Sequence, residues 1–234
     1  MAADIETIRC NFIGDFKIGD NIVANGKALC RLSATNENNT FNKLIVVQAG
    51  SIVEAALDQI IYRAQNHTRE GVPNIPADDL KKIRATEIER FNNIIQAMKT
   101  HKLLDGLGRT IYDDLHRLRK LRNRVHIQFD DEPEQLGRDD HQAFSEREVV
   151  WSLSLCIRVL KHLGEHFPRP ESLSVFEHEV SIPKASSRTG TSSSTGQNSR
   201  PGPPAEERSM GGVRGLLVAS SSPEKRWLEE CYRG

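Results

Sequence analysis

The hydrophobic residues in the middle of the chain recur every three or four positions, which is the spacing of an amphipathic helix. The first long pattern covers residues 41–64 and follows Thr40, a residue type that commonly caps a helix N-terminus. Its apolar positions are Phe41, Leu44, Ile45, Ala49, Ile52, Val53, Ala56, Leu57, Ile60 and Ile61. We therefore expect a long helix over residues 41–64 with Thr40 as its N-cap.

Two more helical patterns follow. One begins after Pro73 and Pro76 and ends before a turn that contains Gly106 and Gly108. Its apolar positions are Leu80, Ile83, Phe91, Ile94, Ile95 and Met98, which predict a second helix. A third helix is expected over residues 110–128.

The fourth pattern begins at Ser145, and Glu148 three residues later completes an S-x-x-E capping box. This helix is expected to end near Gly164 and Pro168. Helices joined by short breaks pack as bundles. The sequence therefore predicts an all-α fold, a bundle of four to five helices over residues 40–168.

The two ends of the chain carry weaker patterns. Residues 1–39 form an N-terminal extension in which either a short helix or a hairpin turning at Asn25-Gly26 is possible, and the helix is favoured. Residues 169–183 alternate weakly and predict a short extended segment. Residues 184–234 are rich in Ser, Gly and Pro, a composition that buries too little apolar surface to order a chain, so we expect a disordered tail.

Composition narrows the functional classes. The chain has 234 residues, of which 37% are hydrophobic and 27% charged, and its formal net charge is zero, which suits one core-forming domain. It lacks both a run of about 18 apolar residues and a secretory leader, so we expect a cytoplasmic protein without a membrane partner. Four scattered cysteines and the absence of phosphate-loop, dinucleotide and nucleophile-elbow motifs predict neither metal nor cofactor. His162 and His166 have a metal-compatible spacing but lack a third ligand.

The third predicted helix combines an apolar stripe with a concentration of basic residues. The stripe comprises Ile111, Leu115, Leu118, Leu121, Val125 and Phe129. Arg122 falls inside it, and Tyr112, Arg119 and His126 line its edge at intervals of seven residues. The remaining cations, which we expect to point outward where they can contact an RNA backbone or simply be solvated, are Arg117, Lys120 and Arg124.

Charge at the margin of an apolar face is costly without a partner. One interpretation is structural: Arg119 and Arg122 pair with Asp113, Asp114 or Glu54, or extend into solvent, while His126 is a polar helix end. The other is catalytic. A histidine can take the proton of a ribose 2′-hydroxyl, and an arginine can hold the phosphate and stabilise its developing charge.

The run LRKLRNRVH, with Arg119 and His126 enclosing six residues, resembles the R-x4-6-H motif of the HEPN superfamily. The resemblance implies an all-α domain, a metal-independent endoribonuclease with Arg119, Arg122 and His126 as catalytic residues, and a homodimer in which the motifs of two protomers face each other. It further implies a toxin or defence effector with RNA as substrate and an antitoxin or defence partner. Asn123 and Tyr112 are then the expected supporting residues.

Two alternatives stay open. A non-catalytic member of the same family would bind nucleotide, RNA or protein and keep the Arg/His face for dimer contacts. A purely structural interaction module is the third possibility, and the tail favours it.

Overall fold

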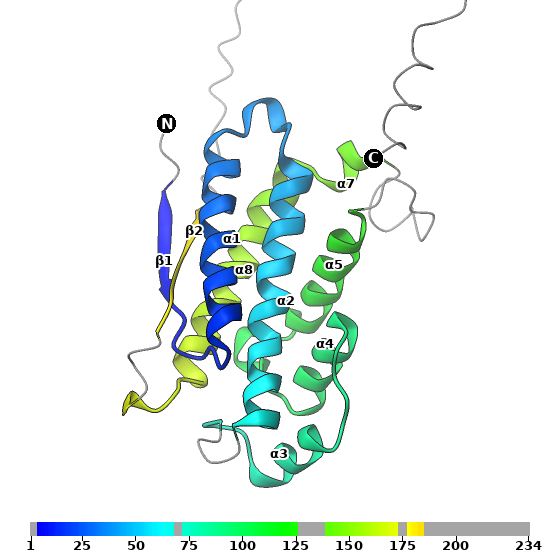
Figure 1. Cartoon of the computed structure of the whole chain (residues 1–234). Helices are drawn as coiled ribbons and strands as arrows, with labels where there is room; N and C mark the ends of the chain where they lie inside the picture. The colour runs from blue at the N-terminus through cyan, green and yellow to red at the C-terminus, as the bar shows by residue number, and fades with distance from the viewer. Residues whose placement is uncertain (1–3, 68–71, 126–138, 173–176, 185–234) are drawn as a thin grey trace, which may run out of the picture. The chain divides into compact units, whose positions relative to one another are not determined.

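The computed structural model describes residues 4–67, 72–125, 139–172 and 177–184, and within these ranges the chain is mainly helical, as predicted (Figure 1). The helices are α1 (Phe16–Ala34), α2 (Asn42–Asn66), α3 (Ala77–Arg84), α4 (Phe91–Thr100), α5 (Ile111–Asn123), α7 (Asp140–Ala143) and α8 (Glu146–His166). The strands β1 (Ile5–Arg9) and β2 (Glu179–Pro183) form a two-stranded antiparallel sheet. The predicted disordered tail, residues 184–234, lies outside the described residues from residue 185 onward.

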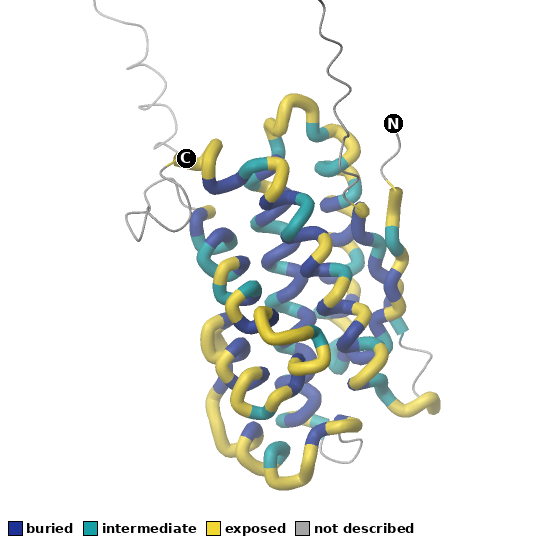
Figure 2. The backbone as a smooth tube through the Cα atoms, turned by 180° about the vertical axis from the view of Figure 1, so that it is seen from behind, coloured by how far each residue is buried: buried dark blue, intermediate teal, exposed yellow. Residues whose placement is uncertain are grey.

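Helix α2 is the central element. It packs against α1, α5 and α8 and also touches α3 and α4, and Figure 1 shows it between α1 and α5. Figure 2 shows buried positions gathered in the interior of the bundle and exposed positions on the outer turns. The helix predicted over residues 41–64 is confirmed, but its N-cap is Phe41 and not Thr40, whose hydroxyl instead donates to the Glu37 carbonyl.

The composition of α2 also meets the requirement for a membrane-spanning helix. Asn42–Asn66 is long enough, and its most apolar window has a mean hydropathy of 1.6. Because 61% of that window is buried inside the bundle, packing between helices accounts for its apolar character equally well.

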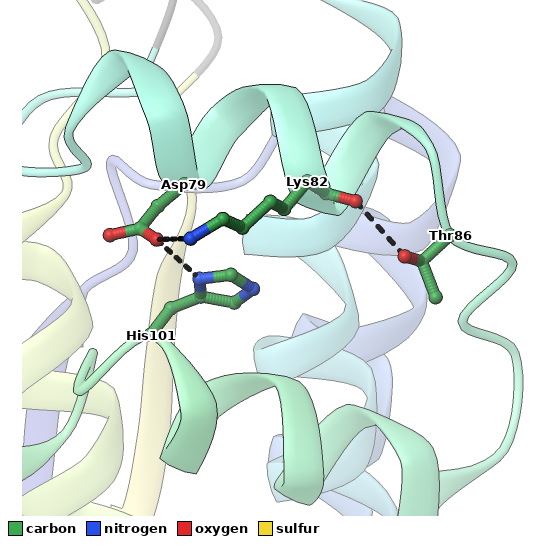
Figure 3. A network of polar contacts seen from close by, with 4 residues as sticks. All are labelled: Asp79, Lys82, Thr86 and His101. Atoms are coloured by element: carbon green, nitrogen blue, oxygen red, sulfur yellow. Dashed lines mark hydrogen bonds and ion pairs between the residues drawn. The ribbon is translucent and has the colours of Figure 1, made fainter.

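The second predicted helix is two helices, α3 and α4, so the expectation of one continuous helix is wrong. The chain leaves the helical conformation after Ala85 and is extended at Arg90. An Asp–His contact joins the two helices (Figure 3). His101 Nδ1, directly after α4, lies 3.0 Å from Asp79 Oδ1 in the first turn of α3. The same carboxylate is 3.7 Å from Lys82 Nζ, and the hydrogen bond from His101 lowers the pKa of Asp79.

The favoured helix in the N-terminal extension is confirmed, and it is longer than expected. Its N-cap Asp15 accepts a hydrogen bond from the Ile18 amide at 3.1 Å. The alternative turn at Asn25-Gly26 is wrong, because Gly26 lies inside α1 where β2 crosses it. A Cβ added at Gly26 would be 2.9 Å from the Ser181 carbonyl oxygen, so glycine permits this close approach.

The extended segment expected over residues 169–183 is present as β2, which pairs with the unpredicted strand β1 in the register Ile5↔Pro183 to Arg9↔Glu179. The N-terminal residues therefore pack directly on the bundle through both a strand and a helix. Residues 173–176 of that expected segment lie outside the described residues.

The fourth predicted helix is confirmed as α8, with small differences at its ends. Ser145 is the N-cap, but its side chain makes no capping hydrogen bond, and the Glu148 side chain pairs with Arg117 of α5. The helix continues through Gly164, where an added Cβ would be 2.8 Å from the Arg9 carbonyl oxygen. The third predicted helix is α5, and residues 126–128 of its expected span lie outside the described residues.

A buried arginine joins the end of α2 to two distant segments. Arg63 is fully buried, and its guanidinium donates hydrogen bonds to the carbonyl oxygens of Phe12, Phe167 and Pro168. These carbonyls belong to the β1–α1 connection and to the residues at the end of α8. The side chain thereby fixes two connections whose backbone acceptors would otherwise be buried without donors.

We expect Arg63→Met to lower the free energy of unfolding by about 3 kcal/mol or more, because buried carbonyl acceptors lose their donor. Arg31→Met is the matched control, since Arg31 is exposed on α1, and it should change stability by no more than about 0.5 kcal/mol. Urea unfolding followed by circular dichroism measures both. Equal effects of the two substitutions would contradict a bridging role for Arg63.

Candidate functional site

Helix α5 carries the candidate site, and its apolar stripe holds it against α2 and α4. Ile111, Leu115, Leu118 and Leu121 are buried, as the sequence pattern predicts. Val125 differs, because its exposed fraction is 50%. Phe129 and the predicted catalytic His126 lie outside the described residues, so the site is built here from its α5 part.

Arg122 faces α2 and pairs with the Glu54 carboxylate. Gly50 lies one turn before Glu54 and permits this contact, because an added Cβ would stand 3.0 Å from the Arg122 Cβ atom. The pair is half-buried. Burial raises the pKa of Glu54, Arg122 opposes that shift, and Asp58 adds to it. Arg122 Nη1 also donates to Asn123 Oδ1 at 3.2 Å. The structural interpretation of Arg122 therefore has a specific partner.

The three cations expected to point outward differ from one another. Arg117 is exposed, yet it is 2.6 Å from a Glu148 oxygen and its guanidinium carbon lies 4.6 Å from the centre of the Trp151 ring. Arg124 is buried, with an exposed fraction of 8%, so its expected outward orientation is wrong. The chain leaves helical geometry at Arg124, the C-cap of α5, which changes the direction of its side chain from that of an ideal wheel. Lys120 is half-exposed.

Arg119 contrasts with Arg117 and Arg122. Among the described residues, it makes neither a hydrogen bond nor an ion pair, and its Nε atom is buried without an acceptor. The side chain as a whole is half-buried. Arginine is always charged at neutral pH, so Arg119 presents a positive charge that no described carboxylate neutralises.

Tyr112 performs a structural task at the other end of α5. Its hydroxyl lies 2.7 Å from Asp105 Oδ1 and 3.2 Å from the Met98 carbonyl oxygen, and it accepts a hydrogen bond from the Leu104 amide. Burial and Asp105 raise the pKa of Tyr112. The hydroxyl therefore holds the α4–α5 connection, and these contacts do not include Arg119.

His116 is a candidate that the sequence reasoning did not select. It lies on α5 between Tyr112 and Arg119, one turn from each, and its Nε2 is 3.2 Å from the Gln96 side-chain nitrogen on α4. Partial burial lowers the pKa of His116, and Arg119 and Lys99 lower it further. His116 lies four residues after Tyr112 and three residues before Arg119, and this helical spacing is the sequence signal that identifies it.

The His162–His166 pair is arranged for stacking. The ring centres are 4.0 Å apart with an interplanar angle of 23°, His162 Nε2 lies 3.0 Å from the Leu103 carbonyl oxygen, and His166 Nδ1 lies 3.1 Å from the His162 carbonyl. In the described part of the chain, no group of three or more His, Cys, Asp or Glu residues is placed to hold a metal ion. Burial and the neighbouring His166 lower the pKa of His162.

Arg119 and Arg122 of α5 should differ in their effect on stability. We expect Arg122→Ala to lower the free energy of unfolding by about 1–3 kcal/mol, because it leaves Glu54 half-buried beside Asp58 without its cation. Arg119→Ala should not lower the free energy of unfolding by more than about 0.5 kcal/mol, because no described partner is lost and a buried donor without an acceptor is removed. Urea unfolding of both variants tests this difference, and a larger loss for Arg119→Ala would contradict it.

Acid should destabilise the fold partly through His162. Its folded-state pKa is lowered from the ordinary value of 6.5, so the unfolded chain binds the extra proton first as the pH falls below about 6.5. The contribution of His162 is therefore fully present above that pH and is lost as the pH falls through the folded-state pKa. Thermal unfolding between neutral and mildly acidic pH should show a smaller acid-induced loss in His162→Gln than in the unsubstituted chain. If the unfolding temperatures of the two proteins fall in parallel with pH, His162 makes no such contribution.

Comparisons of the chain with protein-family models, with curated proteins and with solved structures find no significant match.

Proposed function

We propose that the protein is a metal-independent endoribonuclease of HEPN type that acts as a homodimer. The observation that carries the proposal is the charged, half-buried Arg119 without a described hydrogen-bond or ion-pair partner on the helix that leads into His126. Its support from sequence is the R-x6-H spacing from Arg119 to His126. A cytoplasmic toxin or defence effector, controlled by an antitoxin or another defence partner, is the biological setting that this resemblance implies.

The contacts of α5 divide the proposed roles among its arginines. Arg119 holds the scissile phosphate and stabilises the charge that develops on it, because its guanidinium is not committed to a described carboxylate. Arg122 is committed to Glu54, so we assign it to positioning α5 on α2, with Asn123 beside it. Within this proposal Arg119, rather than Arg122, is the arginine of the R-x6-H motif that contacts the phosphate.

His126 supplies acid–base chemistry in this proposal. Its imidazole removes the proton of the ribose 2′-hydroxyl, and the resulting oxyanion attacks the adjacent phosphorus. The 5′-oxygen of the next nucleotide leaves and takes a proton, so the products are a 2′,3′-cyclic phosphate and a 5′-hydroxyl. Each bond formed to phosphorus replaces one that breaks, and no redox step or metal ion is required.

A homodimer agrees with two exposed apolar residues on neighbouring elements. Leu44 in the first turn of α2 has an exposed fraction of 49%, and Val125, directly after α5, has one of 50%. Helices α2 and α5 pack against each other. In the proposed dimer these two side chains would be covered by the partner.

A specific observation also favours a non-catalytic binding module. Arg117 and Arg122 both pair with carboxylates on neighbouring helices, and Arg124 is buried. Much of the basic character of α5 is therefore used inside the fold. In this alternative Arg119 binds a nucleotide or RNA phosphate and no bond is cleaved.

Incubation with end-labelled RNA, with and without a metal chelator, tests the catalytic proposal. We expect the unsubstituted protein to cleave RNA in both conditions and to leave 2′,3′-cyclic phosphate ends. His126→Ala and Arg119→Ala should each reduce the rate by about 100-fold or more, because they remove the acid–base group and the phosphate donor. Lys27→Ala is the control for loss of one exposed cation, since Lys27 lies on α1.

Three results would contradict the proposal: cleavage that requires metal, cleavage that survives His126→Ala, or no cleavage of any RNA by the purified dimer. RNA binding without cleavage would support the binding module. Folding of each variant is checked by circular dichroism, so that loss of structure is not mistaken for loss of chemistry.

A further inference from the structure

Basic side chains gather where α4 packs against α5, on the side of α5 that carries Arg119. We name this set the α4–α5 basic cluster; it comprises Lys99 of α4 and His116, Arg119 and Lys120 of α5. The two helices pack against each other, and Gln96 joins them through its contact with His116. Partial burial lowers the pKa of His116 most, Arg119, Lys99 and Lys120 are each close enough to lower it further, and Asp113 opposes them.

Arg119 of this cluster differs from Arg117 and Arg122. Arg117 and Arg122 each have a carboxylate within ion-pair distance on a neighbouring helix. In the α4–α5 basic cluster, Lys99 and Arg119 both lie near His116, and Arg119 retains a buried donor without an acceptor. Like charges in proximity repel, and an anion placed among them would relieve the repulsion and supply the missing acceptor. The arrangement is therefore suited to a ligand that carries closely spaced negative charges.

We propose that the α4–α5 basic cluster binds the phosphate backbone of an RNA strand, with Lys99 and His116 extending the phosphate contacts of Arg119 onto α4. The choice of RNA as the ligand rests on the proposed function. In this proposal one strand is contacted from two helices, by Arg119 on α5 and by Lys99 on α4. Contacts of this kind position a strand and read no bases, because every nucleotide presents the same phosphate.

Salt-dependent RNA binding tests the cluster without depending on cleavage. The assay uses a fluorescein-labelled oligouridylate, fluorescence anisotropy, and full-length chains that carry His126→Ala to prevent turnover. We expect Lys99→Ala to weaken binding by about fivefold at low salt and to reduce the slope of log affinity against log salt by about 0.7, the value of one released counterion on a single strand. Lys27→Ala removes an equally exposed lysine on α1 and should leave both quantities unchanged.

His116 provides a second readout that a merely structural role would not move. A bound phosphate favours the protonated imidazole and raises the pKa of His116 above that of the free protein, in which partial burial, together with Arg119, Lys99 and Lys120, holds it low. RNA binding then takes up a proton, so affinity should rise as the pH falls from neutral to mildly acidic. His116→Gln, which keeps a hydrogen-bonding group near Gln96, should flatten this pH dependence by comparison with its parent.

The outcomes separate this proposal from the proposed function. If Lys99→Ala and Lys27→Ala behave alike, or if no RNA binds, the cluster is not a phosphate site. If Lys99→Ala weakens binding as expected but the unsubstituted chain cleaves no RNA, the result supports the cluster as a phosphate site and contradicts the ribonuclease proposal. If the unsubstituted chain cleaves RNA while Lys99→Ala changes neither the affinity nor its salt dependence, the result supports the ribonuclease proposal and contradicts the cluster as a phosphate site.

Discussion

The fold depends on covering α2 on several sides. Its buried positions are too many for one stripe, and they are Asn42, Ile45, Val46, Ala49, Gly50, Ile52, Val53, Ala56, Leu57, Gln59, Ile60, Ile61, Arg63 and Ala64. Full burial of one large aliphatic side chain contributes about 1.5–3 kcal/mol, so α1, α5 and α8 are all drawn onto this helix. The polar side chains among these buried positions lose their contacts with water, so each needs a hydrogen-bond partner in the fold. Gln59 accepts from the amides of Gly14 and Asp15, and Asn42 donates to the Phe144 carbonyl.

These requirements fix the orientation of α5. Gly50 lets α5 approach α2 closely, and the Glu54–Arg122 pair sets its rotation. Arg119 lies three residues earlier, about 60° away around a helix of 3.6 residues per turn. Once Arg122 faces α2, Arg119 therefore faces the α4 side, where His116 meets Gln96. The packing of the core and the location of the unneutralised charge are two consequences of one helix rotation.

The sequence predicted what depends on local periodicity. The positions of α2 and α8 and the buried stripe Ile111 to Leu121 follow from spacing alone. It did not predict the break between α3 and α4 or the pairing of β1 with β2, because both rest on contacts between distant residues. For the same reason, a helical wheel places Arg124 outward, although it is buried. The sequence also left Glu54 as one of three possible partners for Arg122, which the structure pairs with it. His116 escaped selection because its significance depends on Lys99 from another helix.

The difference between Arg119 and Arg122 is also an argument about energy. A buried donor without an acceptor costs about 1–3 kcal/mol, and Arg119 Nε is such a donor, whereas Arg122 has acceptors on Glu54 and Asn123. An unsatisfied group in an otherwise well-paired helix is a local inconsistency, and folds tend to retain such inconsistencies at functional sites. A phosphate oxygen at Arg119 would remove the cost without disturbing the core, whereas one at Arg122 would have to displace Glu54. The energetics of the free protein thus favour Arg119 as the residue that receives the ligand.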